Sequence, residues 1–159
     1  MGLVRLVRLL VWIGYNHLLL VQDPKKESPL LWQLPGGGVG RWESFADAAI
    51  RQCQEETGVP VELRDLHLRF CLDSRASTEV PTSGKVIGRN RVCLYEVLLP
   101  KTTCVPLEGS TGEKTGVFSK VDVERRKIPL VLEHRGLLNE VGFFDGFDRP
   151  MTTLKRSPD

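Results

Sequence analysis

Two adjacent glutamates, Glu55 and Glu56, are the residues of this sequence best suited to do chemistry. They stand near the end of the stretch PGGGVGRWESFADAAIRQCQEETGVP, residues 35–60. Two neighbouring carboxylates repel each other, and a divalent cation with oxygen ligands relieves that repulsion. At about 100° per residue of a helix, Gln52, Glu55 and Glu56 point the same way. The spacing indicates an acidic metal site, with Gln52 where a third carboxylate would complete the cluster.

The simpler interpretation of Glu55 and Glu56 is a solvated helix face near a helix end. Their surroundings favour a site. Arg51 precedes Glu55 by one helical turn and can hold its carboxylate in one orientation. Before the helix, residues 36–38 are all glycine, which allows backbone groups to approach a cation or a phosphate closely.

The same stretch resembles the Nudix box, whose pattern is Gly, five residues, Glu, seven residues, then Arg-Glu-apolar-any-Glu-Glu-any-Gly-apolar. The matching positions are Gly37, Glu43, Arg51, Cys53, Glu55, Glu56, Gly58 and Val59. Only Gln52 departs from the pattern, because it stands where the family has glutamate. So many fixed positions are far more specific than a short glycine motif. The resemblance implies one Nudix domain over residues 1–148, followed by a tail over residues 149–159.

The resemblance implies hydrolysis of a nucleoside diphosphate linked to another moiety, with Mg²⁺ or Mn²⁺ as the cofactor. Such an ion neutralises pyrophosphate oxygens and raises the acidity of a bound water. Carried over from the family, Glu55 and Glu56 are the acidic ligands, and the carbonyl of Gly36 contributes a further oxygen. Gly37 and Gly38 are expected beside the phosphates.

Two further residues of the box have supporting roles by the same resemblance. Arg51 would orient Glu55, and Glu43 would support the loop or an outer shell of the metal.

Gln52 offers a neutral carbonyl oxygen but no negative charge, and it takes up no proton at neutral pH. Losing a positioned base costs about 10²–10⁴ in rate. Glu113, in a loop before a strand, is our preferred substitute acid, with a plain surface glutamate as the alternative. Weaker candidates are Asp73, Glu79 and Glu96. Without a substitute, the chain would be a weakened Nudix module that binds a nucleotide or a protein partner without cleaving it.

Residues outside the box suggest how a nucleotide could be held. Arg89 and Arg91, with Asn90, could reach phosphates or a base, although basic residues at strand ends are usually solvated. Trp42, in the glycine-rich loop, is a candidate for stacking on a base, whereas Trp32 is expected in the core. His17, His67 and His134 lack metal-ligand spacing and are expected to be structural.

The substrate itself stays open. The sequence does not distinguish dinucleoside polyphosphates, nucleotide sugars, damaged nucleoside triphosphates and capped RNA, and an oligomer is possible.

Strands and helices alternate around this stretch. Strands are expected over residues 3–13, 17–22, 86–100 and 116–121, with strand character over 59–74 and polar loops over 74–85 and 101–116. Ser44 and Gly58 mark the ends of one helix. Its residues Ala46, Ile50 and Cys53 should face the core. A second helix is expected within 129–144. This order indicates an α/β (α+β) fold, a mixed sheet with helices on its faces. The Nudix resemblance narrows it to an α/β/α sandwich.

Composition limits the other classes. The 22 Lys and Arg residues nearly balance the 20 Asp and Glu residues, which does not indicate a nucleic-acid surface. Arg5 and Arg8 interrupt the apolar N-terminus, so buried strands around a turn at residues 14–16 explain it better than a membrane segment. The four cysteines, Cys53, Cys71, Cys93 and Cys104, show no metal-ligand spacing and are expected to be reduced thiols in the cytoplasm.

Overall fold

The computed structural model describes residues 3–24, 31–78, 86–125 and 127–144, and its strands form one sheet. The strands are β1 (Val4–Ile13), β2 (His17–Gln22), β3 (Gly36–Gly38), β4 (His67–Thr78), β5 (Val86–Leu99) and β6 (Lys114–Ser119). Their order is β4-β5-β1-β2-β6, with β3 paired to β1. β1 and β5 run parallel, and the other pairs are antiparallel. The predicted mixed sheet is confirmed.

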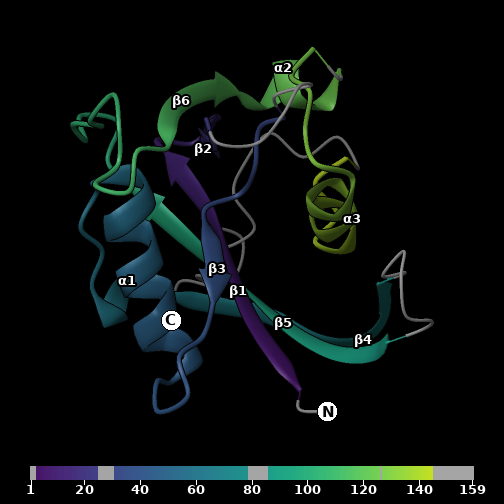
Figure 1. Ribbon diagram of the computed structural model, residues 1–159. Coiled ribbons are helices and arrows are strands. Elements are labelled where there is room, and N and C mark those ends of the chain that lie inside the picture. The colour runs from purple at the N-terminus through teal and green to yellow at the C-terminus, as the bar shows by residue number, and fades with distance from the viewer. Residues whose placement is uncertain (1–2, 25–30, 79–85, 126, 145–159) are drawn as a thin grey trace, which may run out of the picture.

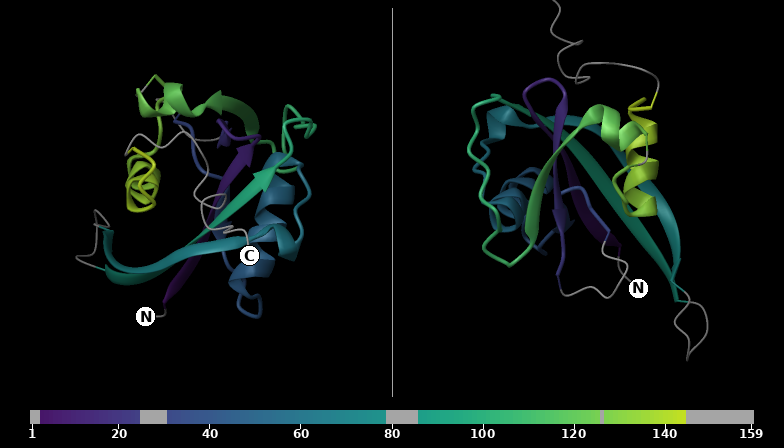
Figure 2. Two further views of the ribbon diagram at one scale, coloured as in Figure 1. Left: turned by 180° about the vertical axis from the view of Figure 1, so that it is seen from behind. Right: turned by 90° about the horizontal axis from the view of Figure 1, so that it is seen from above.

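Helices cover both faces of this sheet (Figures 1 and 2). They are α1 (Phe45–Thr57), α2 (Lys120–Glu124) and α3 (Leu132–Glu140). Because strand side chains alternate, Val7 and Leu9 of β1 enter one core with α1, whereas Leu10 and Trp12 enter a second core with α3. The α/β/α sandwich expected from the resemblance is confirmed.

The helix α1 begins and ends where its capping residues predict. The Ser44 hydroxyl accepts a hydrogen bond from the Asp47 amide at 3.0 Å. Gly58 adopts a left-handed φ of 72°, a backbone conformation that favours glycine. Of the residues expected in the core, Cys53 is fully buried and Ile50 packs against the core, but Ala46 is only half-buried. The buried stripe instead continues through Ala48, Ala49 and Thr57.

Residues 59–74, expected to have strand character, begin differently. A short 3₁₀ helix, η1 (Leu63–Asp65), precedes β4. Its start is fixed by side chains, since the Glu62 amide donates to the Asp65 carboxylate at 2.8 Å. The polar loop predicted over 74–85 is also partly wrong, because β4 continues to Thr78 by pairing with β5; residues 79–85 lie outside the described residues.

The second half of the chain follows the prediction more loosely. The last strand runs from Lys114 to Ser119, so it lies two residues before the predicted range, and α2 follows it at once. The Ser119 hydroxyl starts α2 by accepting a hydrogen bond from the Asp122 amide at 3.2 Å. The predicted second helix is α3. The tail, residues 149–159, lies outside the described residues.

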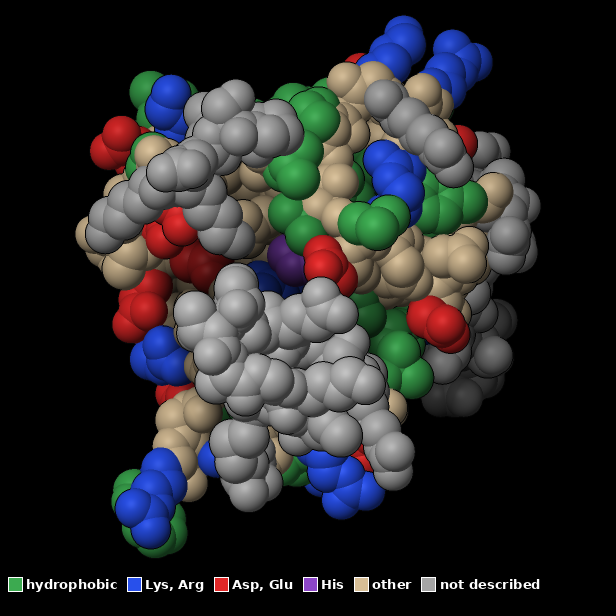
Figure 3. Space-filling model, turned by 45° about the vertical axis from the view of Figure 1, so that its right-hand side comes forward, with side chains coloured by type: hydrophobic (Ala, Val, Ile, Leu, Met, Phe, Trp, Pro, Cys, Tyr) green, Lys and Arg blue, Asp and Glu red, His purple; other side chains and the backbone are tan. Residues whose placement is uncertain are grey.

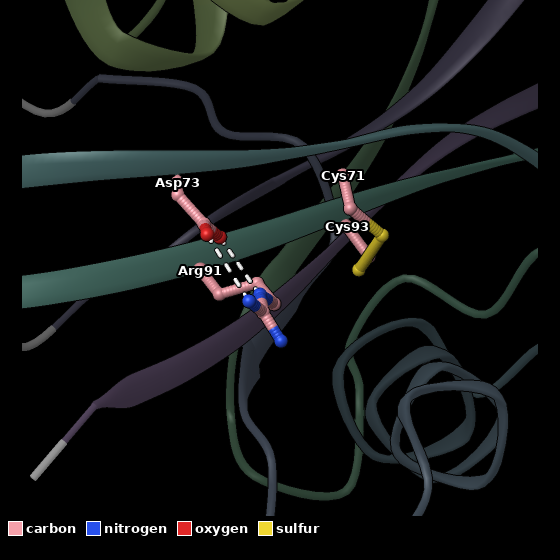
Figure 4. Close-up of a disulfide and its surroundings, with 4 residues drawn as sticks. All are labelled: Cys71, Asp73, Arg91 and Cys93. Atoms are coloured by element: carbon pink, nitrogen blue, oxygen red, sulfur yellow. Dashed lines mark hydrogen bonds and ion pairs between the residues drawn. A yellow bond between two sulfur atoms is a disulfide. The ribbon is translucent and has the colours of Figure 1, made fainter.

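A disulfide joins Cys71 of β4 to Cys93 of β5 (Figure 4). The prediction of reduced thiols is therefore wrong for these two cysteines. They stand directly opposite each other in the antiparallel register, with their Cα atoms 4.1 Å apart, which is a pairing that can be bridged. Cys53, buried, and Cys104, exposed, are free. Within the described residues, no helix has the length and apolar character needed to cross a membrane.

Candidate active site

An arginine–glutamate pair ties the glycine-rich loop to α1. Arg51 Nε and Nη2 donate to the Glu43 carboxylate at 2.8 and 2.9 Å, and Nη2 also donates to the Gly38 carbonyl at 3.0 Å. Glu43 receives a further hydrogen bond from the Gly40 amide at 2.9 Å. These hydrogen bonds, that from Arg51 first, lower the pKa of Glu43 to about 2. The loop conformation is thus fixed by an ion pair that is half-buried.

The two glutamates of the helix end have different surroundings. Glu55 is partly exposed, and its Oε2 accepts a hydrogen bond from Arg51 Nη1 at 3.3 Å. Glu56 is more enclosed, and its Oε1 accepts from the Gly36 amide at 3.3 Å. Arg51 thus contacts Glu55 across one helical turn, as their spacing predicts. Gly36, whose carbonyl is the expected further ligand, meets Glu56 through its amide.

The surroundings of Glu56 raise its pKa. Its pKa is raised to about 7, first by burial and then by the charges of Glu113 and Asp23. The guanidinium of Arg8 and the hydrogen bond from the Gly36 amide oppose this shift. A carboxyl group whose pKa is raised to near neutral by its own burial and by acidic neighbours is typical of a functional site.

The segment 101–113 closes over the C-terminal turn of α1. The Ser110 hydroxyl and the Thr111 amide donate to the Glu55 carbonyl at 3.1 and 3.3 Å. A Cβ at Gly109 would lie 2.1 Å from the Glu56 carbonyl oxygen, so only glycine allows this approach. The consequence is that Glu113, the acid expected to substitute for the missing glutamate, lies within electrostatic reach of Glu56.

Gln52 is engaged with the glycine loop. Its Nε2 donates to the Gly38 carbonyl at 3.2 Å, and a Cβ at Gly37 would lie 2.7 Å from the same nitrogen. The Gly38 carbonyl therefore accepts from both Arg51 and Gln52. A glutamate at position 52 has no proton to donate there, so the amide is suited to fastening the loop.

Two residues near Glu56 were missed by sequence reasoning. Asp23 directly follows β2, and within a charged loop it gave no signal beyond that position. Arg8 was noted only as a charge that interrupts an apolar segment. Its single hydrogen bond within the described residues runs from Nη1 to the Leu34 carbonyl at 3.3 Å. The signal in the sequence was an arginine within the apolar segment that forms the central strand β1.

Several sequence candidates are not brought to Glu56. Arg91 instead forms two hydrogen bonds with Asp73, at 2.7 and 3.1 Å (Figure 4). Arg89 is exposed on β5, and no hydrogen bond within the described residues joins it to the acids of α1. Trp42 is 90% exposed and lies under the Arg41 guanidinium.

The remaining candidates are structural or undescribed. Glu96 is fully buried on the α3 face, where Trp12 Nε1 donates to it at 2.7 Å and Arg69 pairs with it, so it is not a substitute base. Glu79 lies outside the described residues. Trp32 packs in the second core, as expected. His134 accepts a hydrogen bond from the Leu34 amide at 3.0 Å, which agrees with a structural role.

The donor set around Glu56 fits a hard cation. Among the described residues, no three or more His, Cys, Asp or Glu side chains are placed to hold a metal ion together. Mg²⁺, however, is commonly bound by one or two carboxylates and completed by water and substrate phosphates. Glu55 and Glu56 supply two carboxylates, and the pKa of Glu56 is raised first by its burial and then by the charges of Glu113 and Asp23.

The fold is a mixed sheet between helices, and Arg51 joins its glycine loop to the acidic end of α1. The chain belongs to the Nudix family, because the family model for the Nudix domain matches residues 4–120. It is also similar to an RNA pyrophosphohydrolase of Bartonella clarridgeiae, 43% identical over 49 residues. That match spans 31% of this chain and 28% of the relative, so it covers less than a third of either.

Solved structures share the fold at low identity. The Nudix domain of Shewanella oneidensis NrtR, complexed with ADP ribose, matches with a TM-score of 0.67 and 17% identity over 89% of this chain and 88% of that chain. A bifunctional NMN adenylyltransferase/ADP ribose pyrophosphatase of Francisella tularensis, complexed with AMP and a Mn ion, matches with a TM-score of 0.66 and 20% identity. That match covers 88% of this chain and 41% of that chain.

Proposed function

We propose that this chain hydrolyses the pyrophosphate bond of a nucleoside diphosphate linked to another moiety, with Mg²⁺ or Mn²⁺ as cofactor. The observation that carries the proposal is the pair Glu55 and Glu56, presented by α1 beside a glycine loop that Arg51 fixes. Membership of the Nudix family and the pyrophosphohydrolase relatives support it. A bound cation would supply charge neutralisation at the phosphates and an acidified water.

The residues of the site have different roles in this proposal. Glu55 and Glu56 hold the cation, and Arg51 keeps Glu55 in position. The amides of the glycine loop, at Gly37 and Gly38, approach the phosphates. Gln52 fastens this loop and takes no proton.

The base that accepts a proton from water is then Glu113. Its position within electrostatic reach of Glu56 supports this role, as does the contact between its carboxylate and the Thr111 hydroxyl, which holds it in the segment over α1. A carboxylate at this place replaces the acid that Gln52 lacks.

The alternative is a Nudix module that binds a nucleotide or a protein partner and does not cleave it. Gln52 favours this alternative, since its amide has replaced a carboxylate of the family pattern. The retained Arg51, Glu55 and Glu56 favour the enzyme. Two neighbouring carboxylates repel each other, and a bound cation would relieve that repulsion.

The substrate class includes ADP-ribose-like nucleotides and capped RNA. ADP ribose is held by one structural relative, and RNA pyrophosphohydrolase is the name of several sequence relatives. A nucleotide substrate favours a cytoplasmic location. The Cys71–Cys93 disulfide opposes it, because disulfides are rare in the cytoplasm.

A hydrolysis screen tests the proposal. ADP-ribose, a dinucleoside polyphosphate, a nucleotide sugar, a nucleoside triphosphate and capped RNA are each incubated with Mg²⁺ or Mn²⁺, and released phosphate and nucleoside monophosphate are measured. Turnover that disappears with EDTA and in Glu56→Gln supports the enzyme. Folded protein that binds a nucleotide but turns over no member of the panel supports the binding module.

A further inference from the structure

Arg8 occupies an unusual place on the central strand. Its neighbours on β1, Val7 and Leu9, are fully buried in the core beneath α1. Because side chains alternate along a strand, Arg8 points to the opposite face with Leu10, toward α3. A guanidinium in this apolar row requires desolvation, and burial is indeed the largest influence on its pKa, which it lowers.

Within the described residues, Arg8 uses only part of its hydrogen-bonding capacity. A guanidinium has five N–H donors in a planar fork. Within the described residues Arg8 makes one hydrogen bond, to the Leu34 carbonyl at 3.3 Å, and no ion pair within 4.0 Å. By contrast, Arg51 uses its fork on Glu43, Glu55 and a loop carbonyl. Arg8 is therefore held in place while most of its donors make no hydrogen bond within the described part of the chain.

Residues of the candidate site lie near the Arg8 guanidinium. Arg8 pairs directly with Gly36 in the β1–β3 ladder, and the Gly36 amide donates to Glu56. The carboxylates of Glu56 and of Glu133 on α3 both act on the charge of Arg8. Arg8 thus lies between the acidic helix end and α3. Figure 3 shows acidic, basic and histidine side chains around a hollow on the side of the molecule that carries α3.

The backbone of Leu34 holds the Arg8 side chain in place. The peptide groups of Leu34 connect Arg8 to α3, because the carbonyl accepts from Arg8 and the amide donates to His134 at 3.0 Å. Leu34 is fully buried, so this anchor is fixed in the second core. A guanidinium fork anchored at one nitrogen can present its other donors to an anionic group such as a phosphate.

From this geometry we propose that Arg8 is a substrate-binding residue, which donates to non-bridging oxygens of the substrate's diphosphate on the α3 side of Glu56. This inference rests on the proposed function and adds a residue to it. A phosphate beside a metal-bound carboxylate carries negative charge, and Arg is suited to bind such oxygens with two parallel hydrogen bonds. The side chain would select for phosphate at this position without touching the reacting water.

The test is binding of the α,β-methylene analogue of ADP, whose bridging carbon resists hydrolysis, measured by calorimetry with Mg²⁺ present. Arg8→Gln should weaken the analogue roughly 10- to 100-fold, the range for a lost charge-assisted hydrogen bond. Mn²⁺ binding without nucleotide, followed by electron paramagnetic resonance, should be unchanged or tighter, since Arg8→Gln removes a positive charge near Glu56. Arg64→Gln, at an exposed arginine paired with Glu62, is the matched control and should change neither value.

The outcomes separate the two claims. Wild-type protein that binds neither Mn²⁺ nor the analogue overturns the proposed function. Wild-type protein that binds both, with Arg8→Gln binding the analogue within twofold of it, overturns the role of Arg8 alone.

If Arg8→Gln does not fold, Arg8→Lys keeps the charge and the stem but loses the fork, and it should weaken the analogue several-fold. The wild-type protein provides an independent readout. The ¹⁵Nε–H resonance of Arg8, assigned by its absence in Arg8→Lys, should shift when the analogue is added. An unshifted resonance at saturating analogue contradicts the contact.

Discussion

Arg51 and Glu43 form a forked ion pair, with two nitrogen–oxygen distances of 2.8 and 2.9 Å, that joins α1 to the glycine loop. The same guanidinium reaches the Gly38 carbonyl and Glu55. One side chain therefore positions both the glycine loop and the Glu55 carboxylate, the groups that we propose meet the phosphates and the cation. In the proposed function, Glu43 would therefore act as a positioning residue through Arg51.

We expect Glu43→Gln to lower kcat/KM roughly 10- to 100-fold, as is typical when a group that supports a metal ligand is removed. The melting temperature should change little, because both side chains of the pair are partly exposed to solvent. Steady-state kinetics and a thermal melt check both values. Glu62→Gln, which breaks an exposed ion pair with Arg64, serves as the control. An unchanged kcat/KM in Glu43→Gln would show that the loop holds its position without the pair.

Gln52→Glu should have opposite effects with and without metal. The carboxylate cannot donate to the Gly38 carbonyl, so the metal-free protein should lose about 1 kcal/mol of unfolding free energy. Added Mn²⁺ should restore the loss, since a cation can bridge two oxygen atoms that otherwise repel. Melting curves with EDTA or Mn²⁺ measure this difference. Gln54→Glu, on the exposed side of the same helix, should show neither effect.

The kinetics of Gln52→Glu separate the enzyme from the binding module. A sharp rise in turnover means that the site is built for catalysis and that Gln52 only reduces its rate. Tight nucleotide binding without any gain of hydrolysis favours the binding module.

Glu56 predicts how the metal-free protein responds to pH. Its pKa, about 7 instead of the ordinary 4.5, means that the folded state holds a proton that the unfolded chain has released between those values. The free energy of unfolding should therefore fall as pH rises from about 4.5 to about 7, and this group should add no slope above that range. Urea unfolding in EDTA across this window checks the sign. A slope that persists unchanged in Glu56→Gln would assign it to another group.

The same proton competes with the cation. Binding of Mg²⁺ or Mn²⁺ to Glu56 displaces it, so the dissociation constant should rise about tenfold per pH unit below pH 7 and level off above. Mn²⁺ titrations followed by electron paramagnetic resonance measure this dependence. An affinity independent of pH between about 5 and 7 would mean that Glu56 is not a ligand.

The Cys71–Cys93 disulfide should stabilise the fold. It closes a loop of 22 residues, for which the chain-entropy model gives about 3 kcal/mol. Dithiothreitol should lower the midpoint of urea unfolding of the wild type and leave that of a Cys71→Ser/Cys93→Ser double variant unchanged. Cys104→Ser, at an exposed free cysteine, should keep the sensitivity. Equal midpoints of the wild type with and without reductant would contradict the prediction.

The disulfide also bears on location. Rapid acid quenching of cells, followed by alkylation and mass spectrometry, distinguishes oxidised from reduced Cys71 and Cys93. A cytoplasmic protein should show both thiols largely reduced. Oxidised cysteines in the cell would place the chain in an oxidising compartment.

The sequence was sufficient to predict the elements that neighbouring residues specify. The apolar runs gave β1, β2 and β5, and the caps Ser44 and Gly58 gave α1, because each of these elements is specified by neighbouring residues. It was insufficient where the outcome depends on register. Cys71 and Cys93 meet only because β4 and β5 pair with that offset.

The candidate site follows the same division. Arg51, Glu55 and Glu56 are joined through one helix, so their spacing indicates their proximity. Asp23 and Arg8 come near Glu56 from separate strands, through the sheet, and no spacing along the chain encodes that distance. The roles of all these residues remain predictions.

The most direct test of the central claim is the position of a cation in crystals of the wild-type protein soaked in Mn²⁺, located by anomalous scattering. We predict a peak bonded to carboxylate oxygens of Glu56 and Glu55, beside the glycine loop and absent in Glu56→Gln. A well-ordered site in which both carboxylates face away from each other, with no peak between them at saturating Mn²⁺, would contradict the account.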